Sequence, residues 1–282
     1  MKKVLYIMTA LFLTASSMLQ AQTTLGRGEL GLSGGGMNYI GDLNNQSVFG
    51  RPNLGYGAYF RYKLDPRWAV LVGGSLGHVE GGSPDAIIRR NLSFESDIWE
   101  GYARVEFNYQ PFGFKGKSNP WSTFLFVGIG MFGFNPTTMY VNSNGEPESV
   151  ELRPLGTEGQ GTSAYPDRKP YSLNQIMMPF GIGVKFKPSE AFYITAEYGF
   201  RKTWTDYIDD VSTTYVDPSV LEGVAQDLYD RTGEIEEGYH NLVGSRRGDD
   251  SLNDWYSYFN VSIAFNAEFL FGWMVKKNCE RK

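Results

Sequence analysis

The chain has 282 residues and a formal net charge of −5, from 26 Lys and Arg against 31 Asp and Glu. This acidic balance argues against nucleic-acid binding, because a nucleic-acid interface needs a basic surface. Beyond the N-terminal region no apolar run is long enough to cross a bilayer as a helix, which argues against a helical membrane protein. The single cysteine, Cys279, excludes an internal disulfide framework.

The N-terminal segment 1–21 is predicted to be a secretory signal peptide. Lys2 and Lys3 provide a basic n-region, residues 4–19 are mostly apolar, and Ala21 is a small residue before the expected cleavage. A membrane anchor is the alternative, but the apolar run is short for a span. Cleavage leaves a short segment 22–27, with no cysteine at the new N-terminus to carry a lipid, and 24 basic residues against 31 acidic ones.

Alternation of apolar and polar side chains predicts eight strands in the rest of the chain. In the last of them, Phe259, Val261 and Ile263 alternate with Asn260 and Ser262. Such a run is longer than an ordinary strand of about 5–6 residues, but it suits a tilted strand that crosses a bilayer. The predicted strands are Glu29–Met37, Tyr56–Leu64, Trp68–His78, Ile98–Tyr109, Trp121–Phe134, Ile176–Lys187, Phe192–Arg201 and Trp255–Phe271.

Short and long connections are expected to alternate between these strands. The short turns are Asp65-Pro66, Pro111–Pro120 and Pro188–Glu190, and the long loops are Asp42–Asn53, Glu80–Leu92, Asn135–Asn174 and Thr203–Leu252. Short periplasmic turns and long outer loops are typical of bacterial outer-membrane barrels. We therefore predict an all-β fold, an eight-stranded antiparallel transmembrane β-barrel over residues 28–271, with a periplasmic tail over residues 272–282.

Tryptophans near the predicted strand ends are expected to form two girdles at the level of the lipid headgroups. A soluble β-sandwich with tryptophans at its rim is the alternative, but it does not explain aromatic residues that alternate along such long strands. A soluble lipocalin-like barrel has the opposite pattern, apolar inside and polar outside. The tryptophans are Trp68, Trp121, Trp204, Trp255 and Trp273.

The polar face of the strands carries five acids and five bases. An eight-stranded barrel has an interior just wide enough for side chains, and a buried charge left unpaired costs several kcal/mol. We therefore expect these charges to pair and fill the lumen, which indicates a plugged barrel and not a diffusion pore. An interior proton-transfer site is the sharper alternative. The ten residues are Glu29, Arg61, Lys63, Glu100, Arg104, Glu106, Lys185, Glu197, Arg201 and Glu268.

The last long loop and its ends hold most of the remaining candidates for chemistry. Six carboxylates there offer a calcium site, but no EF-hand-like spacing is present and we expect a solvated acidic loop. Arg247-Gly248-Asp249 matches an integrin-type tripeptide that also recurs by chance. The six acids are Asp206, Asp209, Asp210, Asp249, Asp250 and Asp254.

A helix and a histidine complete the candidates. Asp217 as N-cap and Pro218 as first helical position predict a short amphipathic helix over residues 219–231. His78 near the rim is the residue that a lipid-modifying enzyme would need, yet no serine is marked beside it. We expect no catalytic residue, no cofactor and no metal.

Five sequence runs together carry a specific family signal: Asn38–Leu43, Arg89–Phe94, Pro154–Gly161, Tyr198–Asp217 and Asn253–Tyr256. Through these runs the chain resembles PorG-type outer-membrane barrels of the type IX secretion system, which are found in Bacteroidota. The resemblance extends from about Gly28 to the last strand, and the tail from Gly272 to Lys282 is less typical.

The resemblance implies a non-enzymatic accessory or anchoring component of a machine that exports cargo with a C-terminal sorting domain and supports gliding in some species. It implies outer-membrane lipids and periplasmic ring lipoproteins as partners. Polar residues of the matching runs are expected to order the loops over the barrel mouth: Arg89, Arg90, Asn91, Asp206, Asp209, Asp210, Thr213 and Thr214. A structural or binding barrel unrelated to secretion is the alternative, and a lipid-modifying enzyme is a weaker one.

Overall fold

The computed structural model describes residues 27–44, 52–85, 90–113, 119–142 and 144–270. The predicted signal peptide 1–21 and the predicted tail 272–282 lie outside the described residues, as do Arg89, Trp273 and Cys279.

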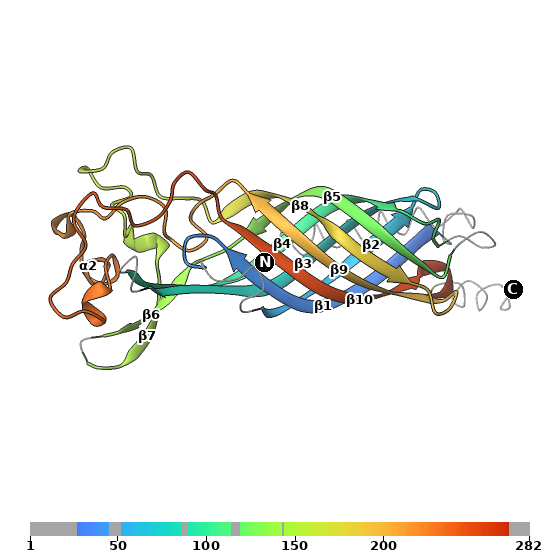
Figure 1. Ribbon diagram of the computed structural model, residues 1–282, viewed down its shortest axis with the longest axis horizontal. Coiled ribbons are helices and arrows are strands. Elements are labelled where there is room, and N and C mark those ends of the chain that lie inside the picture. The colour runs from blue at the N-terminus through green and yellow to red at the C-terminus, as the bar shows by residue number, and fades with distance from the viewer. Residues whose placement is uncertain (1–26, 45–51, 86–89, 114–118, 143, 271–282) are drawn as a thin grey trace, which may run out of the picture.

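Eight long strands form a closed antiparallel ring. They follow the order β3-β2-β1-β10-β9-β8-β5-β4, and β4 also pairs with β3, so every strand of the ring has two neighbours (Figure 1). Closure leaves no unpaired edge in the barrel, which is the condition for a sheet to cross lipid. The predicted fold class is therefore confirmed. The ring strands are β1 (Gly28–Ile40), β2 (Asn53–Lys63), β3 (Trp68–Asp85), β4 (Arg90–Asn108), β5 (Trp121–Gly133), β8 (Asn174–Phe186), β9 (Phe192–Thr203) and β10 (Trp255–Asn266).

The two ends of the barrel differ in their connections. Segments 64–67, 109–120 and 187–191 join strands at one end, which we call the turn end. Asp65 closes the first of these turns, because its Oδ1 accepts hydrogen bonds from the backbone N–H of Arg67 (2.7 Å) and Trp68 (2.9 Å). The long segments 134–173 and 204–254 extend beyond the other end, which we call the mouth (Figure 1). This asymmetry is the one that the sequence predicts.

Side chains alternate between the lumen and the outer surface along each strand. In β5, Phe124 and Phe126 are buried, whereas Leu125, Val127 and Ile129 are exposed. The same alternation leaves a belt of large apolar residues around the ring, from Leu32 on β1 to Val261 on β10. Among the described residues, no helix has the length and the apolar character to cross a membrane.

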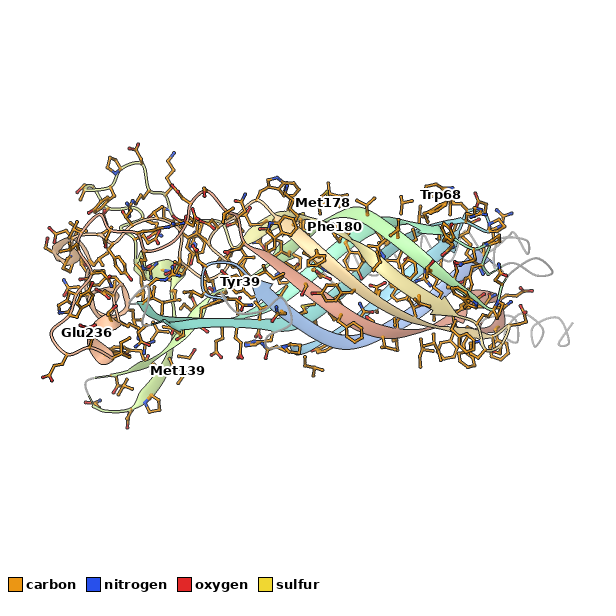
Figure 2. The ribbon with its side chains drawn as sticks, in the orientation of Figure 1. Tyr39, Trp68, Met139, Met178, Phe180 and Glu236 are labelled. Carbon is orange, nitrogen blue, oxygen red and sulfur yellow. The ribbon has the colours of Figure 1, made fainter. Side chains whose placement is uncertain are left out.

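Tryptophans mark both ends of this apolar belt. Trp68 and Trp121 open β3 and β5 at the turn end, and Figure 2 shows Trp68 far from the loops. Trp204 follows β9 and Trp255 opens β10, both at the mouth. Tryptophan prefers the headgroup zone of a bilayer, so the two levels bound the membrane-spanning part of the barrel.

The predicted loop Glu80–Leu92 is largely strand, which corrects the prediction. β3 continues to Asp85 and β4 begins at Arg90, so the two strands extend past the mouth as a long hairpin. The inward side chains of this extension still pack against other residues. Val79, Leu92 and Phe94 are buried, and Phe94 packs against Tyr39 with ring centroids 4.8 Å apart. Packing against the loops therefore stabilises strand beyond the membrane.

Two further predictions about the long loops need correction. Segment Asn135–Asn174 contains a hairpin of β6 (Thr137–Val141) and β7 (Pro147–Glu151), joined to the ring through Glu95 and Thr137. The helix expected over residues 219–231 is broken into the 3₁₀ turn η3 (Pro218–Val220), the helix α2 (Ala225–Leu228) and the 3₁₀ turn η4 (Thr232–Glu234). Asp217 does cap η3, but Gly223 at φ +57° interrupts the helical path.

Candidate functional site

Nine of the ten predicted inward charges are buried in the barrel lumen. On the side of β1 and β2, Arg61 Nη1 lies 3.0 Å from Glu29 Oε2, and Lys63 Nζ lies 3.1 Å from Glu29 Oε1. Arg61 also reaches β4, where its Nε lies 2.8 Å from Glu106 Oε2. Lys185 on β8 approaches the same carboxylate from another side, at 2.6 Å. Glu106 thus joins three strands.

The remaining charges cross the lumen between β4 and β9. Arg104 donates to both carboxylate oxygens of Glu197, at 2.9 and 2.6 Å, and also contacts Glu106 at 2.9 Å. Nearer the mouth, Arg201 donates to Glu100 at 2.9 and 3.1 Å. β4 and β9 are not neighbours in the ring, so these pairs span the interior.

Glu268 does not belong to the layer of ion-paired charges in the lumen, which corrects the prediction. β10 ends at Asn266, residues 267–270 are helical, and the side chain of Glu268 is exposed. The inward alternation stops where the strand stops. The layer therefore holds four acids and five bases.

Aromatic side chains and one glycine shape the space around the ion pairs. The Arg104 guanidinium lies 4.2 Å from the Phe126 ring centroid, and Lys185 Nζ lies 4.3 Å from that of Phe124. Gly128 on β5 is paired with Arg104, and a Cβ at Gly128 would come within 2.7 Å of Arg104 Cβ. Charges from five strands and aromatic rings from β5 thus fill the lumen of the barrel.

Above this layer, the long loops 134–173 and 204–254 fold over the mouth and form what we call the cap. Glu158 is the central hydrogen-bond acceptor of the cap. Glu158 is fully buried. Its carboxylate accepts hydrogen bonds from the backbone N–H of Ser212 (2.9 Å) and from the backbone N–H and hydroxyl of Thr213 (3.0 and 2.7 Å). Arg247 Nη1 donates to it at 3.0 Å. One carboxylate therefore joins the loop before β8 to two parts of the loop before β10.

Arg247 is the cation at the centre of the cap and is 2% exposed. Besides Glu158, its guanidinium donates to the carbonyl oxygens of Asp210 (2.6 Å) and Tyr229 (3.1 Å). The arginine of the Arg247-Gly248-Asp249 tripeptide is thus enclosed within the fold. An adhesion receptor cannot reach it without opening the cap.

Asp210 holds a strained corner of the cap. Its φ of 63° is the one positive value for a non-glycine residue in the described ranges. The buried carboxylate accepts hydrogen bonds from Tyr171 Oη (2.7 Å) and Thr157 Oγ1 (2.5 Å). Burial raises the pKa of Asp210 to about 6, and the nearby Arg247 opposes that rise. These contacts hold the left-handed backbone in place.

Tyr39 at the end of β1 joins two carboxyl groups of the cap. Its hydroxyl lies 2.6 Å from Asp209 Oδ2 and 2.7 Å from Asp254 Oδ1, and all three residues are buried. Burial raises the pKa of both carboxyls, and the charge of Asp209 raises that of Asp254 further. A phenol has one proton to donate. The second short contact therefore requires a carboxyl that carries its own proton.

The acidic loop is not solvated as expected. Asp206, Asp209, Asp210 and Asp254 are all buried in the cap, because the loop folds back over the mouth. Burial raises the pKa of Asp206 to about 8. Across the part of the chain that the structure describes, no group of three or more His, Cys, Asp and Glu is placed to hold a metal ion.

The other loop residues singled out from sequence lie in two places. Arg90 is buried under the cap and donates to the carbonyl oxygens of Arg247 (2.5 Å) and Asp42 (2.9 Å). Thr214 accepts from Arg168 Nη2 at 2.7 Å. Asn91 lies at the cap's edge and donates to Glu234 at 3.0 Å.

His78 lies away from the cap, on the outer surface of β3. Its Nδ1 lies 2.9 Å from Asp97 Oδ1, and its Nε2 lies 4.0 Å from Glu95 Oε2. The ion-pair partners of its ring are therefore carboxylates of β4.

Sequence reasoning missed the residues that hold the cap together. Glu158 and Tyr39 stand in runs that carry the family resemblance, but neither was singled out as a site residue. Arg168 donates to the carbonyl oxygens of Glu158 (2.8 Å) and Thr214 (3.1 Å). No sequence pattern marked Arg168 as a structural residue. Such contacts join segments far apart in sequence, so no local pattern announces them.

These features define a small transmembrane β-barrel protein. The ring of strands is closed, its outer face carries an apolar belt, ion pairs fill its lumen, and a cap covers its mouth. Residues 2–153 match the family model described as Domain of unknown function (DUF6089), and the chain belongs to that family. No curated protein matches the chain.

Several solved outer-membrane proteins are similar in structure at low identity. Neisserial surface protein A (NspA) has 7% identity and a TM-score of 0.41, with 85% of this chain and 96% of that chain covered. OprG from Pseudomonas aeruginosa has 10% identity and a TM-score of 0.40, with 85% and 97% covered. Ail, the attachment invasion locus protein of Yersinia pestis, has 12% identity and a TM-score of 0.38, with 85% and 98% covered.

Proposed function

We propose that this chain is a non-enzymatic integral outer-membrane barrel that serves as an accessory or anchoring component of the type IX protein secretion machinery. Its signal peptide directs export, the apolar belt contacts outer-membrane lipids, and the mouth faces the outside. The turn end then faces the periplasm, where ring lipoproteins of the machine are the partners.

The observation that carries the proposal is the convergence of the resembling runs on the cap. Tyr39 from the first run contacts Asp209 from the fourth and Asp254 from the fifth. Glu158 from the third run accepts from Thr213 of the fourth. Runs that are far apart in sequence thus contribute to one folded element, which supports a shared role for them and a resemblance that is more than a chance match of short segments.

The filled lumen supports a role at the surfaces of the barrel. Cross-lumen pairs such as Arg104–Glu197 and Arg201–Glu100 occupy the interior. Passage of cargo through this barrel would require them to break, and breaking buried pairs costs several kcal/mol each. A component that anchors or positions other proteins needs no such passage.

Deletion of the gene in the source bacterium tests the proposal directly. The deletion strain should lose surface delivery of cargo with a C-terminal sorting domain, and the full-length chain should restore it. Normal delivery of such cargo in the deletion strain would contradict the proposal. Affinity capture of the barrel should co-purify periplasmic ring lipoproteins, whereas a structural or binding barrel unrelated to secretion would not.

Variants of the cap separate its role from that of the membrane barrel. Glu158→Gln removes the buried negative charge that accepts from Arg247, while Glu148→Gln on the exposed β7 is the matched control. If the cap positions the machine, the first variant should reduce cargo delivery at equal barrel abundance and the second should not. Equal delivery by both variants would place the function elsewhere on the barrel.

A further inference from the structure

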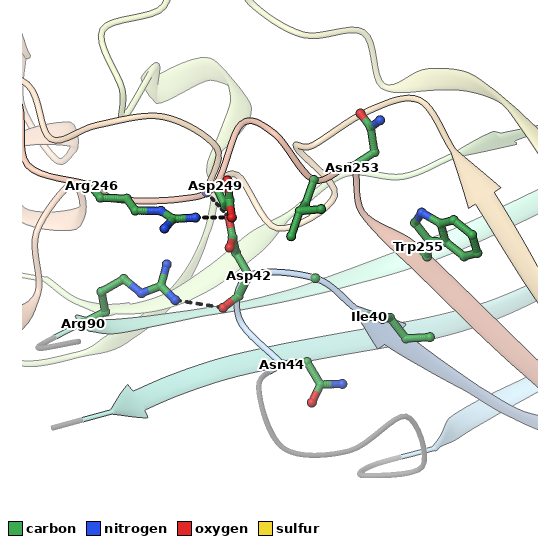
Figure 3. Close-up of a pocket in the computed structure, with 10 residues that line it drawn as sticks. Ile40, Asp42, Asn44, Arg90, Arg246, Asp249, Asn253 and Trp255 are labelled. Carbon is green, nitrogen blue, oxygen red and sulfur yellow. Dashed lines mark hydrogen bonds and ion pairs between the residues drawn. The ribbon is translucent and has the colours of Figure 1, made fainter. Parts of the chain in front are cut away.

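A cavity of about 600 Å³ opens beside the cap at the level of the mouth (Figure 3). Its volume lies within the range of small-molecule sites, about 300–1,000 Å³. Three separate parts of the chain form its walls: the end of β1 with the residues after it, the start of β4, and the segment that leads into β10. Its polar lining includes Asp42, Asn44, Arg90, Arg246, Asp249 and Asn253.

The cavity lies where the barrel meets the headgroup zone. Ile40 is the last residue of β1 and Trp255 the first of β10, and the two are paired in register. Both line the cavity, as does Leu252, which is 67% exposed. Trp255 belongs to the tryptophan level at the mouth, so one wall is apolar and lies at the membrane surface.

The charges of the lining cancel. Arg246 pairs with Asp249, and the carboxylate of Asp42 accepts a hydrogen bond from the backbone N–H of Asp249 at 2.7 Å. Arg90 adds a buried guanidinium that donates to the carbonyl oxygen of Asp42. Two guanidinium groups and two carboxylates give a net charge of zero. The carboxylates repel an anion that enters the cavity, and the guanidinium groups repel a cation.

A neutral ligand rich in hydroxyl groups suits this lining. Each hydroxyl donates and accepts, so it pairs with guanidinium and amide N–H groups and with carboxylate oxygens alike. The apolar face of a sugar ring also suits a wall formed by Trp255, Leu252 and Ile40, since an aromatic ring provides a large flat contact. We propose that the cavity binds the neutral saccharide rings of a glycan, either free or carried by a glycolipid.

The position of the cavity allows the glycan to come from a glycolipid or from solution. With the mouth outside, as proposed above, the sugars of an outer-leaflet glycolipid lie at the level of Trp255. A free oligosaccharide would enter the same cavity from solution past Arg246, whose side chain is 67% exposed.

The test uses the full chain and two variants of the lining. Arg246→Ala and Asn253→Ala remove exposed polar groups and leave the buried cap contacts in place. Binding is measured by calorimetry in detergent with a panel of neutral oligosaccharides. It is measured separately with the barrel in phosphatidylethanolamine–phosphatidylglycerol nanodiscs, with and without lipopolysaccharide. Loss of a charged hydrogen bond predicts affinity about tenfold lower or more for Arg246→Ala.

Arg231→Ala is the matched control, because Arg231 forms an i,i+3 pair with Glu234 elsewhere in the same loop. Binding of soluble oligosaccharide that Arg246→Ala and Asn253→Ala weaken, and Arg231→Ala does not, supports the saccharide site. Binding only to nanodiscs with lipopolysaccharide, with the same variant pattern, supports it with a glycolipid as the source. Absence of saccharide binding in both formats overturns the proposal, and so does competition by inorganic phosphate, which would indicate an anion site.

Discussion

Arg104 on β4 and Glu197 on β9 form two hydrogen bonds of 2.9 and 2.6 Å across the barrel lumen. β5 and β8 lie between these two strands in the ring, so the pair joins opposite parts of the wall. Asn260 on β10 also donates to Glu197 at 3.0 Å. The Glu197 carboxylate therefore accepts hydrogen bonds from two other strands, and its pair with Arg104 braces the barrel across the lumen.

Arg104→Ala is expected to lower the free energy of unfolding by about 3–5 kcal/mol, because Glu197 loses its buried cation. Equilibrium urea unfolding in lipid vesicles, followed by the gel shift between folded and heated barrel, measures the change. Lys187→Ala is the control. Its partner Glu190 is 69% exposed, and an exposed pair contributes about 1 kcal/mol or less. Equal losses for the two variants would contradict a bracing role for Arg104.

The ion-pair layer predicts that the barrel does not conduct ions. Planar bilayers that contain the purified chain should show no steady conductance, because side chains of β2, β4, β8 and β9 occupy the lumen. Proteolytic removal of the cap should leave the barrel closed. Replacing Arg104, Glu106 and Glu197 together with alanine should open a water-filled path and produce conductance. Conductance by the native chain would show that the layer does not close the lumen.

Glu158→Gln is expected to loosen the cap while the barrel remains folded. The change weakens several charged hydrogen bonds and leaves Arg247 with one carboxylate, that of Asp210 at 3.9 Å, at a cost of about 3 kcal/mol. Limited proteolysis should cleave the loop before β10 faster in this variant than in the native chain. Glu148→Gln on β7 should leave the cleavage rate unchanged. The gel shift of the barrel should be the same in all three proteins, and a parallel loss of that shift would mean that the cap supports the whole fold.

The buried carboxyls predict a cap that is less stable at alkaline pH. Burial raises the pKa of Asp206 to about 8 and raises those of Asp209 and Asp254, whereas an unfolded aspartate titrates near 3.9. A raised folded-state pKa means that the open loop releases its protons first. The cap therefore loses stability as the pH rises from about 4, and the part of this loss that comes from Asp206 is complete above its folded pKa of about 8. The other charged groups that face this cluster are Asp42, Glu158, Arg247 and Arg90.

Hydrogen exchange of residues 205–254 at pH 5 and pH 9 measures this dependence. Exchange should be faster at pH 9 than the intrinsic base-catalysed increase alone requires. The variant Asp206→Asn/Asp209→Asn/Asp254→Asn should lose most of the excess, because an amide cannot ionise. Asp250→Asn, an exposed change in the same loop, should behave as the native chain does. An excess that persists in the triple variant would assign the titration to other groups.

The strands of the barrel were predictable because lipid on one side and a packed lumen on the other force a period of two. That constraint explains why Arg61, Arg104 and Arg201 were placed inside from sequence alone. It ends with the strand, and so Glu268 was placed wrongly. Beyond the membrane, as in β3 after His78, the alternation of side chains depends on which loop residues pack against the strand.

The cap was much less predictable than the barrel. Its acids were identified as a group, but their burial depends on contacts between segments such as 154–161 and 205–216, and these have no local pattern. The expected helix after Asp217 failed for a local reason, since Gly223 adopts a conformation that few other residues tolerate. The hairpin of β6 and β7 carries too few alternating residues to stand out from loop.

The contact between Tyr39 and Asp254 joins residues 215 positions apart. Tyr39 belongs to the first strand and Asp254 directly precedes the last, and those two strands pair to complete the ring. Contacts of such high sequence separation carry a large loop-closure cost, which is paid before the contact stabilises anything. The contact also needs the end of β1 beside the start of β10, so we expect the complete cap to form only in a barrel whose first and last strands have paired.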